Sequence, residues 1–175
     1  MKSVSIIILS IMLITSGCHA QNEAATANSE SIQQQTEQTM DKQSEESMKI
    51  ALAFMDAMGK GDMESMISLM HEDMVWHNEG DKSMPWIGPW KGKKVILEEF
   101  LPVFGANFQT SKWETEDSMS SGNTAAFFGR MAGTLTKSNQ STNEFTFALR
   151  VKVKDGQVIL WNWFEDSYDV SRAYH

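Results

Sequence analysis

Large apolar residues recur every three or four positions in the first part of the chain and at alternating positions in its last third. The first spacing predicts helices, and the second predicts strands with one buried face. Ile50, Phe54 and Met58 share one helical stripe, so we expect a helix that begins at Ser44 and ends before Gly59. Its methionine-rich face is typical of a packed core.

Two more helices are predicted before the strands. Asp62 has a side chain that caps helices, and a short apolar stripe follows it as far as Met70. A third helix is expected over residues 93–108. Pro102 should kink or interrupt this helix, because proline lacks the backbone donor that an α-helix needs.

Strands are predicted over residues 74–79 and, after a Gly/Pro-rich loop at 80–92, over most of the last third. The later strands are expected at residues 112–118, 124–138, 144–154 and 157–166. Asp155 and Gly156 form the best local hairpin signal between two of them. Helices followed by a strand meander predict an α+β fold, with helices on one side of a curved antiparallel sheet.

The N-terminus has the pattern of a secretory signal. Lys2 precedes an apolar run over residues 4–14, which is too short to span a membrane. Cys18 is the only cysteine and stands where cleavage is expected. Residues 1–18 therefore resemble the signal peptide and lipobox of bacterial lipoproteins, which implies export across the inner membrane and a lipid anchor on Cys18 in the cell envelope. An ordinary cleaved signal with an incidental cysteine is the alternative.

Residues 19–43 contain few large apolar side chains, so we expect a flexible polar tether. A peripheral helix over residues 30–43 is the alternative, because glutamine and glutamate favour helices. The remaining residues, 44–175, are long enough to form one domain with a buried core.

Charge and motifs exclude several classes of function. The 175 residues carry a net charge of −8 and no run of basic residues, which argues against a nucleic-acid partner. The chain has no phosphate-binding loop, dinucleotide fingerprint or nucleophile elbow, so serine hydrolase, kinase and dehydrogenase functions have no support and we expect no cofactor.

Three segments carry a family resemblance: residues 69–76 (LMHEDMVW), 85–92 (PWIGPWKG) and 155–166 (DGQVILWNWFED). Together they resemble the SnoaL-like branch of the NTF2-like superfamily. The resemblance implies a cone, in which a curved antiparallel sheet wraps around three N-terminal helices, and it implies a homodimer. The superfamily includes polyketide cyclases, ketosteroid isomerase, limonene epoxide hydrolase and many non-enzymes, so the fold alone does not settle the function.

The resemblance implies that Asp166, near the end of the last strand, is a general base. A carboxylate in an apolar pocket has a raised pKa and accepts protons readily. Asn162 and Phe164 share the strand face of Asp166 if no bulge intervenes. The alternative is that Asp166 caps the turn or segment that follows it.

An electrophilic partner for this base is expected among His77, Arg130, Arg150 and the indole N–H groups of Trp76 and Trp90. For either arginine, an outward salt bridge is the alternative. The predicted ligand pocket therefore consists of six residues: Trp76, His77, Trp90, Arg130, Asn162 and Phe164.

A metal site is not expected. His71, Asp73, His77 and Glu79 alternate, but they form no compact metal-binding motif. Three interpretations stay open: an enzyme that acts on a small hydrophobic molecule, a non-catalytic protein that binds such a molecule, and a dimerisation module without a ligand.

Overall fold

The computed structural model describes residues 17–175, with side chains from residue 32 onward. The predicted signal sequence before residue 17 and the side chain of Cys18 lie outside this described part. The chain divides into two units, residues 1–38 and 39–175. Within the described residues, no helix combines the length and the apolar character that crossing a membrane requires.

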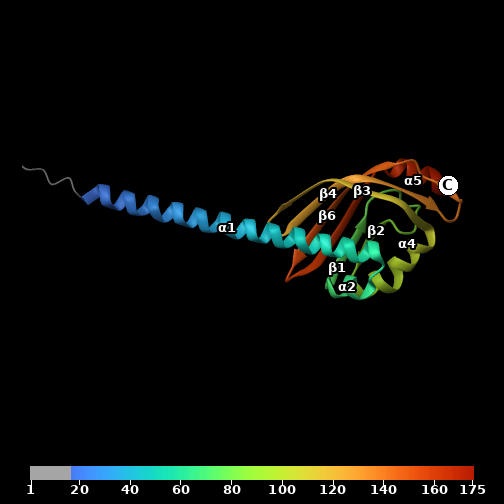
Figure 1. Ribbon diagram of the computed structural model, residues 1–175, viewed down its shortest axis with the longest axis horizontal. Helices are drawn as coiled ribbons and strands as arrows, with labels where there is room; N and C mark the ends of the chain where they lie inside the picture. Colours follow the sequence, from blue (N-terminus) through green and yellow to red (C-terminus); the bar gives the residue numbers. More distant parts are fainter. Residues whose placement is uncertain (1–16) are drawn as a thin grey trace, which may run out of the picture. The chain divides into compact units, whose positions relative to one another are not determined.

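Most helical residues precede residue 108, where they alternate with the first strands, and the later strands follow, with a last helix at the C-terminus (Figure 1). The helical elements are α1 (Gly17–Lys60), α2 (Met63–Ser68), α3 (Lys93–Val95), the π-helical turn η1 (Ile96–Phe100), α4 (Leu101–Asn107) and α5 (Ser167–Tyr174). The strands are β1 (Met70–Asn78), β2 (Gly88–Lys91), β3 (Phe108–Ser121), β4 (Thr124–Leu135), β5 (Gln140–Ser141), β6 (Phe145–Lys154) and β7 (Gln157–Glu165).

Helix α1 begins far before the predicted start at Ser44. The Ser44 hydroxyl donates to the carbonyl of Met40 one turn earlier, at 2.7 Å, and accepts from the backbone N–H of Gly122. Ser44 is therefore inside a helix and is not an N-cap. Residues 19–43 are helical where a flexible segment was expected, because they contain good helix formers and neither glycine nor proline. That residues 19–43 act as a tether for the domain stays a prediction.

The second and third predicted helices are shorter or more divided than expected. Asp62 is an N-cap, as predicted, and accepts from the backbone N–H of Ser65 at 3.1 Å. The third helix is interrupted one turn before Pro102, which lies in the first turn of α4. There the backbone N–H of Leu101 donates to Ile96, five residues back, and this bond defines the π-helical turn.

The strands form one sheet in the order β2-β1-β7-β6-β4-β3, with β5 paired to β4. All neighbours are antiparallel except β1 and β7, which are parallel, so the prediction of a wholly antiparallel sheet is wrong for this pair. The two strands are separated by most of the domain's sequence, and no local turn pattern reports their direction. As a consequence, the carboxyl ends of β1 and β7 meet at the same edge, where Asn78 pairs with Trp163.

The sheet curls strongly around the helices and gives the predicted α+β cone of the NTF2-like fold (Figure 1). Strand β3 has register shifts near Lys112 and Glu116, and such bulges bend a strand. Gly129 on β4 lets the backbone of β3 come close to it, because a Cβ at this position would lie only 1.9 Å from the Glu114 carbonyl oxygen of β3. On the concave side, Phe54 of α1 packs against Trp76 and Trp161.

Candidate functional site

The concave side of the sheet encloses a cavity of about 560 Å³. Its wall comes from α1, α4, α5, the turn η1 and the inner faces of β1, β3, β4 and β7. Five of the six tryptophans of the chain line it: Trp76, Trp86, Trp113, Trp161 and Trp163. A cavity of this size, with a mostly apolar wall, has the dimensions of a small-molecule site.

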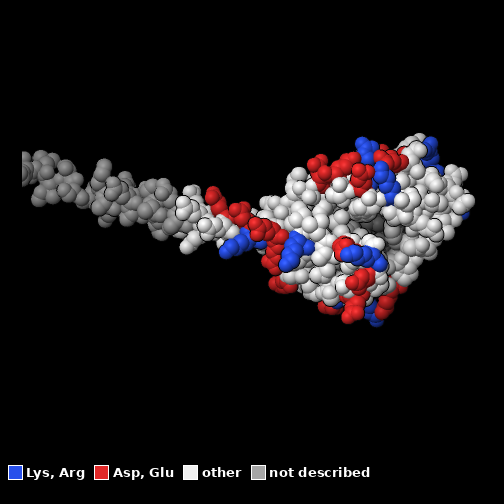
Figure 2. Space-filling model, in the orientation of Figure 1, with Lys and Arg blue, Asp and Glu red and all other residues white. Residues whose placement is uncertain are grey.

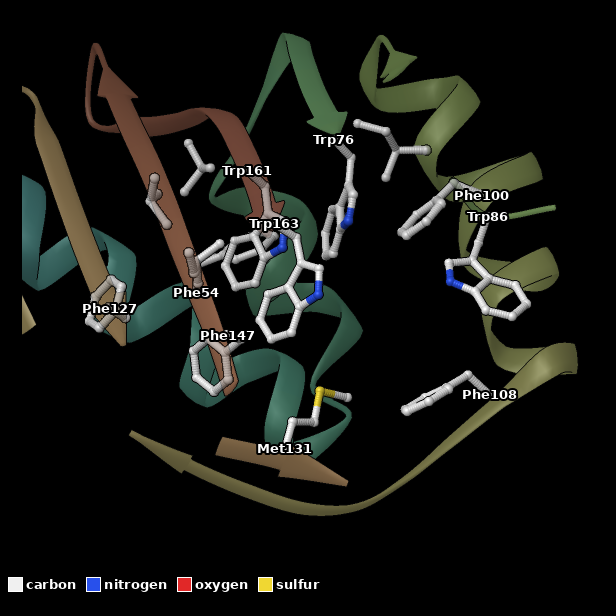
Figure 3. Packing of buried hydrophobic residues seen from close by; sticks show 14 of the residues in the cluster. Phe54, Trp76, Trp86, Phe100, Phe108, Phe127, Met131, Phe147, Trp161 and Trp163 are labelled. Atoms are coloured by element: carbon white, nitrogen blue, oxygen red, sulfur yellow. The ribbon is translucent and has the colours of Figure 1, made fainter. Parts of the chain in front are cut away.

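Two groups of stacked aromatic rings line the cavity, and they meet where the rings of Trp76 and Phe100 have centres 4.9 Å apart (Figure 3). On the sheet side, Trp76 and Trp161 stack with ring centres 4.9 Å apart. On the helix side, Phe104 stacks on Phe100, one turn earlier, with ring centres 5.8 Å apart. It also stacks at 5.5 Å on Phe108, the first residue of β3. The cavity is therefore bounded by aromatic surface from both the sheet and the helices.

Among the described residues, three polar ones reach the cavity wall: Asn78, Thr110 and Glu165. Asn78 ends β1, and its side-chain oxygen accepts from the indole N–H of Trp76 at 3.1 Å. Glu165 ends the parallel strand β7. Because the carboxyl ends of these parallel strands coincide, the polar groups from both strands lie at one end of the sheet.

Glu165 is the only ionisable residue of the wall among the described residues. Its Oε2 accepts from the indole N–H of Trp163 at 2.7 Å, whereas its Oε1 is buried and has no hydrogen-bond partner among the described residues. Burial raises the pKa of Glu165 from 4.5 to about 7, with a smaller contribution from the negative charge of Asp166. The Trp163 hydrogen bond acts in the opposite direction and lowers this pKa.

Asp166, the predicted general base, does not line the cavity. Its side chain is exposed and caps α5, where it accepts from the backbone N–H of Tyr168 at 3.3 Å. This is the capping role that the sequence left open as the alternative. The placement argues against proton transfer by Asp166 inside the cavity.

The predicted pocket face of β7 is the wrong one. Trp161, Trp163 and Glu165 alternate and point to the cavity, whereas Asn162 and Phe164 belong to the opposite face. Asn162 is buried there and accepts from the Arg150 guanidinium at 2.8 Å. The signal for Glu165 was present in the sequence, because it continues the alternation of the two tryptophans.

Of the other predicted pocket residues, one lines the cavity and three lie elsewhere. Trp76 lines the cavity, whereas Trp90 stands on β2 and donates to the carbonyl of Trp86 at 3.3 Å. His77 lies on the outer side of β1, where its Nδ1 is 3.3 Å from an oxygen of Glu79. Arg130 makes the outward salt bridges given as its alternative, with Glu116 at 2.9 Å and with Glu144 at 3.4 Å.

No cluster of three or more metal-ligating side chains occurs in the described part of the chain. The four alternating residues considered from the sequence form two separate pairs, His71 with Asp73 and His77 with Glu79. On the face shown in Figure 2, acidic and basic side chains lie next to each other rather than in a patch of one sign.

The family model of the SnoaL-like domain matches residues 51–161, which is more than half of the chain. The chain belongs to the SnoaL-like family. This SnoaL-like protein has no match among curated protein sequences.

Solved structures agree on the NTF2-like fold. An NTF2-like protein from Burkholderia xenovorans is 22% identical with a TM-score of 0.67, and the match covers 75% of this chain and 98% of the other. A putative isomerase from Rhodopseudomonas palustris is 19% identical with a TM-score of 0.59 over 70% and 90% of the two chains. An LEH-like epoxide hydrolase from M. tuberculosis is 17% identical with a TM-score of 0.57 over 75% and 90%. At these identities the likeness establishes the fold alone.

Proposed function

We propose that this SnoaL-like domain binds a small, largely apolar molecule in the cavity. The observation that carries the proposal is the aromatic lining that both the sheet and the helices give to a 560 Å³ space with few polar groups. Flat rings gain dispersion energy and bury apolar area against such aromatic surfaces. The fold-level similarity to an isomerase and to an epoxide hydrolase-like protein is consistent with a site for small organic molecules.

Intrinsic fluorescence measures this binding directly, because five of the six tryptophans line the cavity. We expect 2-acetylnaphthalene to change the tryptophan emission of the full chain saturably, and native mass spectrometry to show one copy per domain. Gly59 offers an occlusion variant, since it borders the cavity and a Cβ built on it meets no atom within 4 Å. Gly59→Leu should weaken binding at least tenfold.

Gly105→Leu is the matched control for that variant. Gly105 is also helical and also has open space around a built Cβ, but it does not line the cavity. The control should bind the probe as the parent chain does. Equal binding by both glycine variants, or no saturable binding by the parent chain, contradicts the proposed site.

Acid–base catalysis on the bound molecule is the second candidate function. The observation that favours it is a carboxyl group in the cavity wall, Glu165, whose pKa is raised to about 7 by burial. A group with a pKa near neutrality both accepts and releases protons at physiological pH. Glu165 thus takes the place that the sequence analysis gave to Asp166. A non-catalytic carrier that uses the same cavity is the alternative.

The proposed location is the cell envelope, with a lipid on Cys18 as the membrane anchor. Support comes from the sequence pattern of residues 1–18. In bacterial cells, Cys18→Ser should move the processed protein from the membrane fraction to the soluble fraction, or block its processing. A processed Cys18→Ser protein that still sediments with membranes contradicts the anchor.

A further inference from the structure

The polar end of the cavity contains one side-chain oxygen with an unfilled hydrogen-bonding position. Glu165 Oε1 is buried and unpartnered, whereas Oε2 accepts from Trp163. A buried polar atom without a partner costs free energy, and natural proteins rarely keep one without a use. Because Glu165 lines the cavity, a molecule bound there is the available partner.

The surroundings favour the neutral form of this carboxyl group. The wall residues that α1, α4, α5, β1, β3 and β4 contribute are all uncharged. The charged group that acts on Glu165 is the next residue, Asp166. Its negative charge opposes ionisation of the Glu165 carboxyl group. No lysine, arginine or histidine of the described chain lines the cavity to balance an ionised carboxylate. Burial accordingly raises the pKa of Glu165 to about 7.

The hydrogen bond from Trp163 also decides which oxygen carries the proton. An indole N–H is a donor only, so Oε2 must accept from it. The proton of the neutral group is therefore best placed on Oε1, which then becomes a donor without an acceptor. The complementary group on a ligand is an oxygen that accepts a hydrogen bond and carries no full charge.

We propose that Glu165 selects the ligand of this cavity, by donating a hydrogen bond from Oε1 to an uncharged acceptor oxygen of the carbonyl class on an otherwise apolar molecule. This inference rests on the proposed function and names the chemistry of its ligand. Carboxylate and phosphate ligands are disfavoured, because the wall offers them no cation. An ammonium ligand would need the ionised carboxylate, and the test below separates that case.

The proposal has a pH dependence that follows from the proton on Oε1. Below the pKa of Glu165 the donor is present, and the ligand oxygen is satisfied. Above it the donor is replaced by a negative charge that faces the ligand oxygen, so the affinity falls by about tenfold per pH unit. Ligand would therefore be held at mildly acidic pH and released at alkaline pH.

Two probes of nearly equal shape test the inference on the full chain. 2-Acetylnaphthalene carries a carbonyl oxygen, and 2-ethylnaphthalene lacks it. Tryptophan fluorescence titrations from pH 5.5 to pH 9 give both dissociation constants. At pH 5.5 we expect the ketone to bind about tenfold more tightly than the hydrocarbon, and this preference should disappear above about pH 8.

The variants separate hydrogen bonding from general effects of pH. Glu165→Gln places an amide N–H₂ where Oε1 stands, and it should keep the ketone preference at every pH. Glu165→Leu should lose the preference at every pH. Asp166→Asn is the matched control at the adjacent exposed position. It should keep a pH-dependent preference, with the midpoint only slightly lower because the small contribution of the Asp166 charge to the pKa of Glu165 is removed. Near-ultraviolet circular dichroism checks that each variant is folded.

Each outcome has a distinct meaning. If both probes bind equally at pH 5.5, the role of Glu165 is wrong while the proposed cavity function stands. If the cation 2-(aminomethyl)naphthalene binds more tightly than the ketone at pH 7, Glu165 is an ion-pair partner and the inference is overturned. If no probe binds to the folded chain, the proposed function fails and the inference fails with it.

Discussion

The two faces of strand β7 differ more than their sequences suggest. On the inner face, Trp161, Trp163 and Glu165 line the cavity. On the outer face, Asn162 is bonded to Arg150, and Phe164 is 41% exposed. Each face contains aromatic and polar side chains, so residue type alone does not distinguish them. The enclosing elements do, because α1 and α4 cover the inner face with mostly apolar side chains (Figure 3).

The same difference separates two carboxyl groups that are adjacent in the chain. Glu165 lines the cavity, and burial raises its pKa to about 7. Asp166 is exposed and caps α5. A shift of one position along a strand therefore exchanges a candidate acid for a structural cap. The chemistry of this site depends on which face a residue occupies rather than on the presence of a carboxylate near the strand end.

The largest expected effect comes from truncating one aromatic residue on each face. Trp161 is 2% exposed and its ring contacts those of Phe54 and Trp76, so Trp161→Ala should lower the unfolding free energy by about 3–5 kcal/mol. Phe164→Ala on the outer face should cost about 1 kcal/mol or less. Urea unfolding followed by circular dichroism measures both. Similar costs for the two variants would remove the distinction between the faces.

The next effect concerns the pH dependence of stability at Glu165. The carboxyl pKa is 4.5 in an unfolded chain and about 7 in the folded protein, so the folded state binds the proton more tightly. The contribution of protonated Glu165 to the unfolding free energy is fully present below pH 4.5. It is lost as the pH rises through 7, by roughly 3 kcal/mol in total. Glu165→Gln should abolish that loss and be more stable than the parent chain at pH 8.

Asp166→Asn is the control for this pH experiment. Asparagine also caps helices, so the variant should keep most of the parent chain's loss of stability towards pH 8. The loss should be slightly smaller, because the Asp166 charge no longer raises the pKa of Glu165. Other carboxyl groups, among them Asp81 with its pKa lowered to about 2, titrate equally in all three proteins and cancel in the differences. A Glu165→Gln protein with the same pH profile as the parent chain would show that Glu165 is not buried as described.

A smaller effect on the unfolding free energy is expected from the hydrogen-bonded pair Asn162 and Arg150 on the outer face. Asn162 is 3% exposed, and it links Arg150 of β6 to the carbonyl of His77 on β1 through hydrogen bonds of 2.8 and 3.4 Å. Asn162→Ala should cost about 1 kcal/mol, because the exposed Arg150 regains water. A double-mutant cycle with Arg150→Met isolates the pair. A coupling energy of zero would show that the hydrogen bond adds no stability.

Sequence patterns predicted the fold well where the signals were local. Alternation gave the long strands, Asp62 was recognised as a cap, and the quoted segments indicated the SnoaL-like family. The parallel pairing of β1 with β7 and the long α1 were missed. Pairing between distant strands leaves no turn signal, and a polar helix shows no apolar stripe.

The candidate site was predicted less well than the fold, for a physical reason. Which face of β7 is buried depends on helices that pack from elsewhere in the chain, so Asp166 and Glu165 are not distinguished by the strand alone. The alternation of Trp161, Trp163 and Glu165 was the usable signal. The unpartnered Oε1 of Glu165 depends on three-dimensional packing and had no counterpart in the sequence.

The smallest effect on folding is expected where the outer face is apolar. Phe164, Ala148 and Phe128 are neighbours across β7, β6 and β4, and both phenylalanines are more than a third exposed.

The homodimer implied by the family resemblance stays a prediction, and we expect a second copy of the chain to cover this row. Phe164→Glu should change the unfolding free energy of the single chain by less than about 0.5 kcal/mol, because the site is exposed. Yet a carboxylate on each copy would meet its equivalent across a twofold interface, so the variant should sediment as a monomer where the parent chain is a dimer. Tyr168→Glu, at an exposed position outside the sheet, is the control and should leave the parent mass unchanged. A Phe164→Glu protein that sediments like a dimeric parent, or a parent chain that is monomeric at high concentration, would show that the outer face does not pair in this way and that the two faces of β7 differ only in burial.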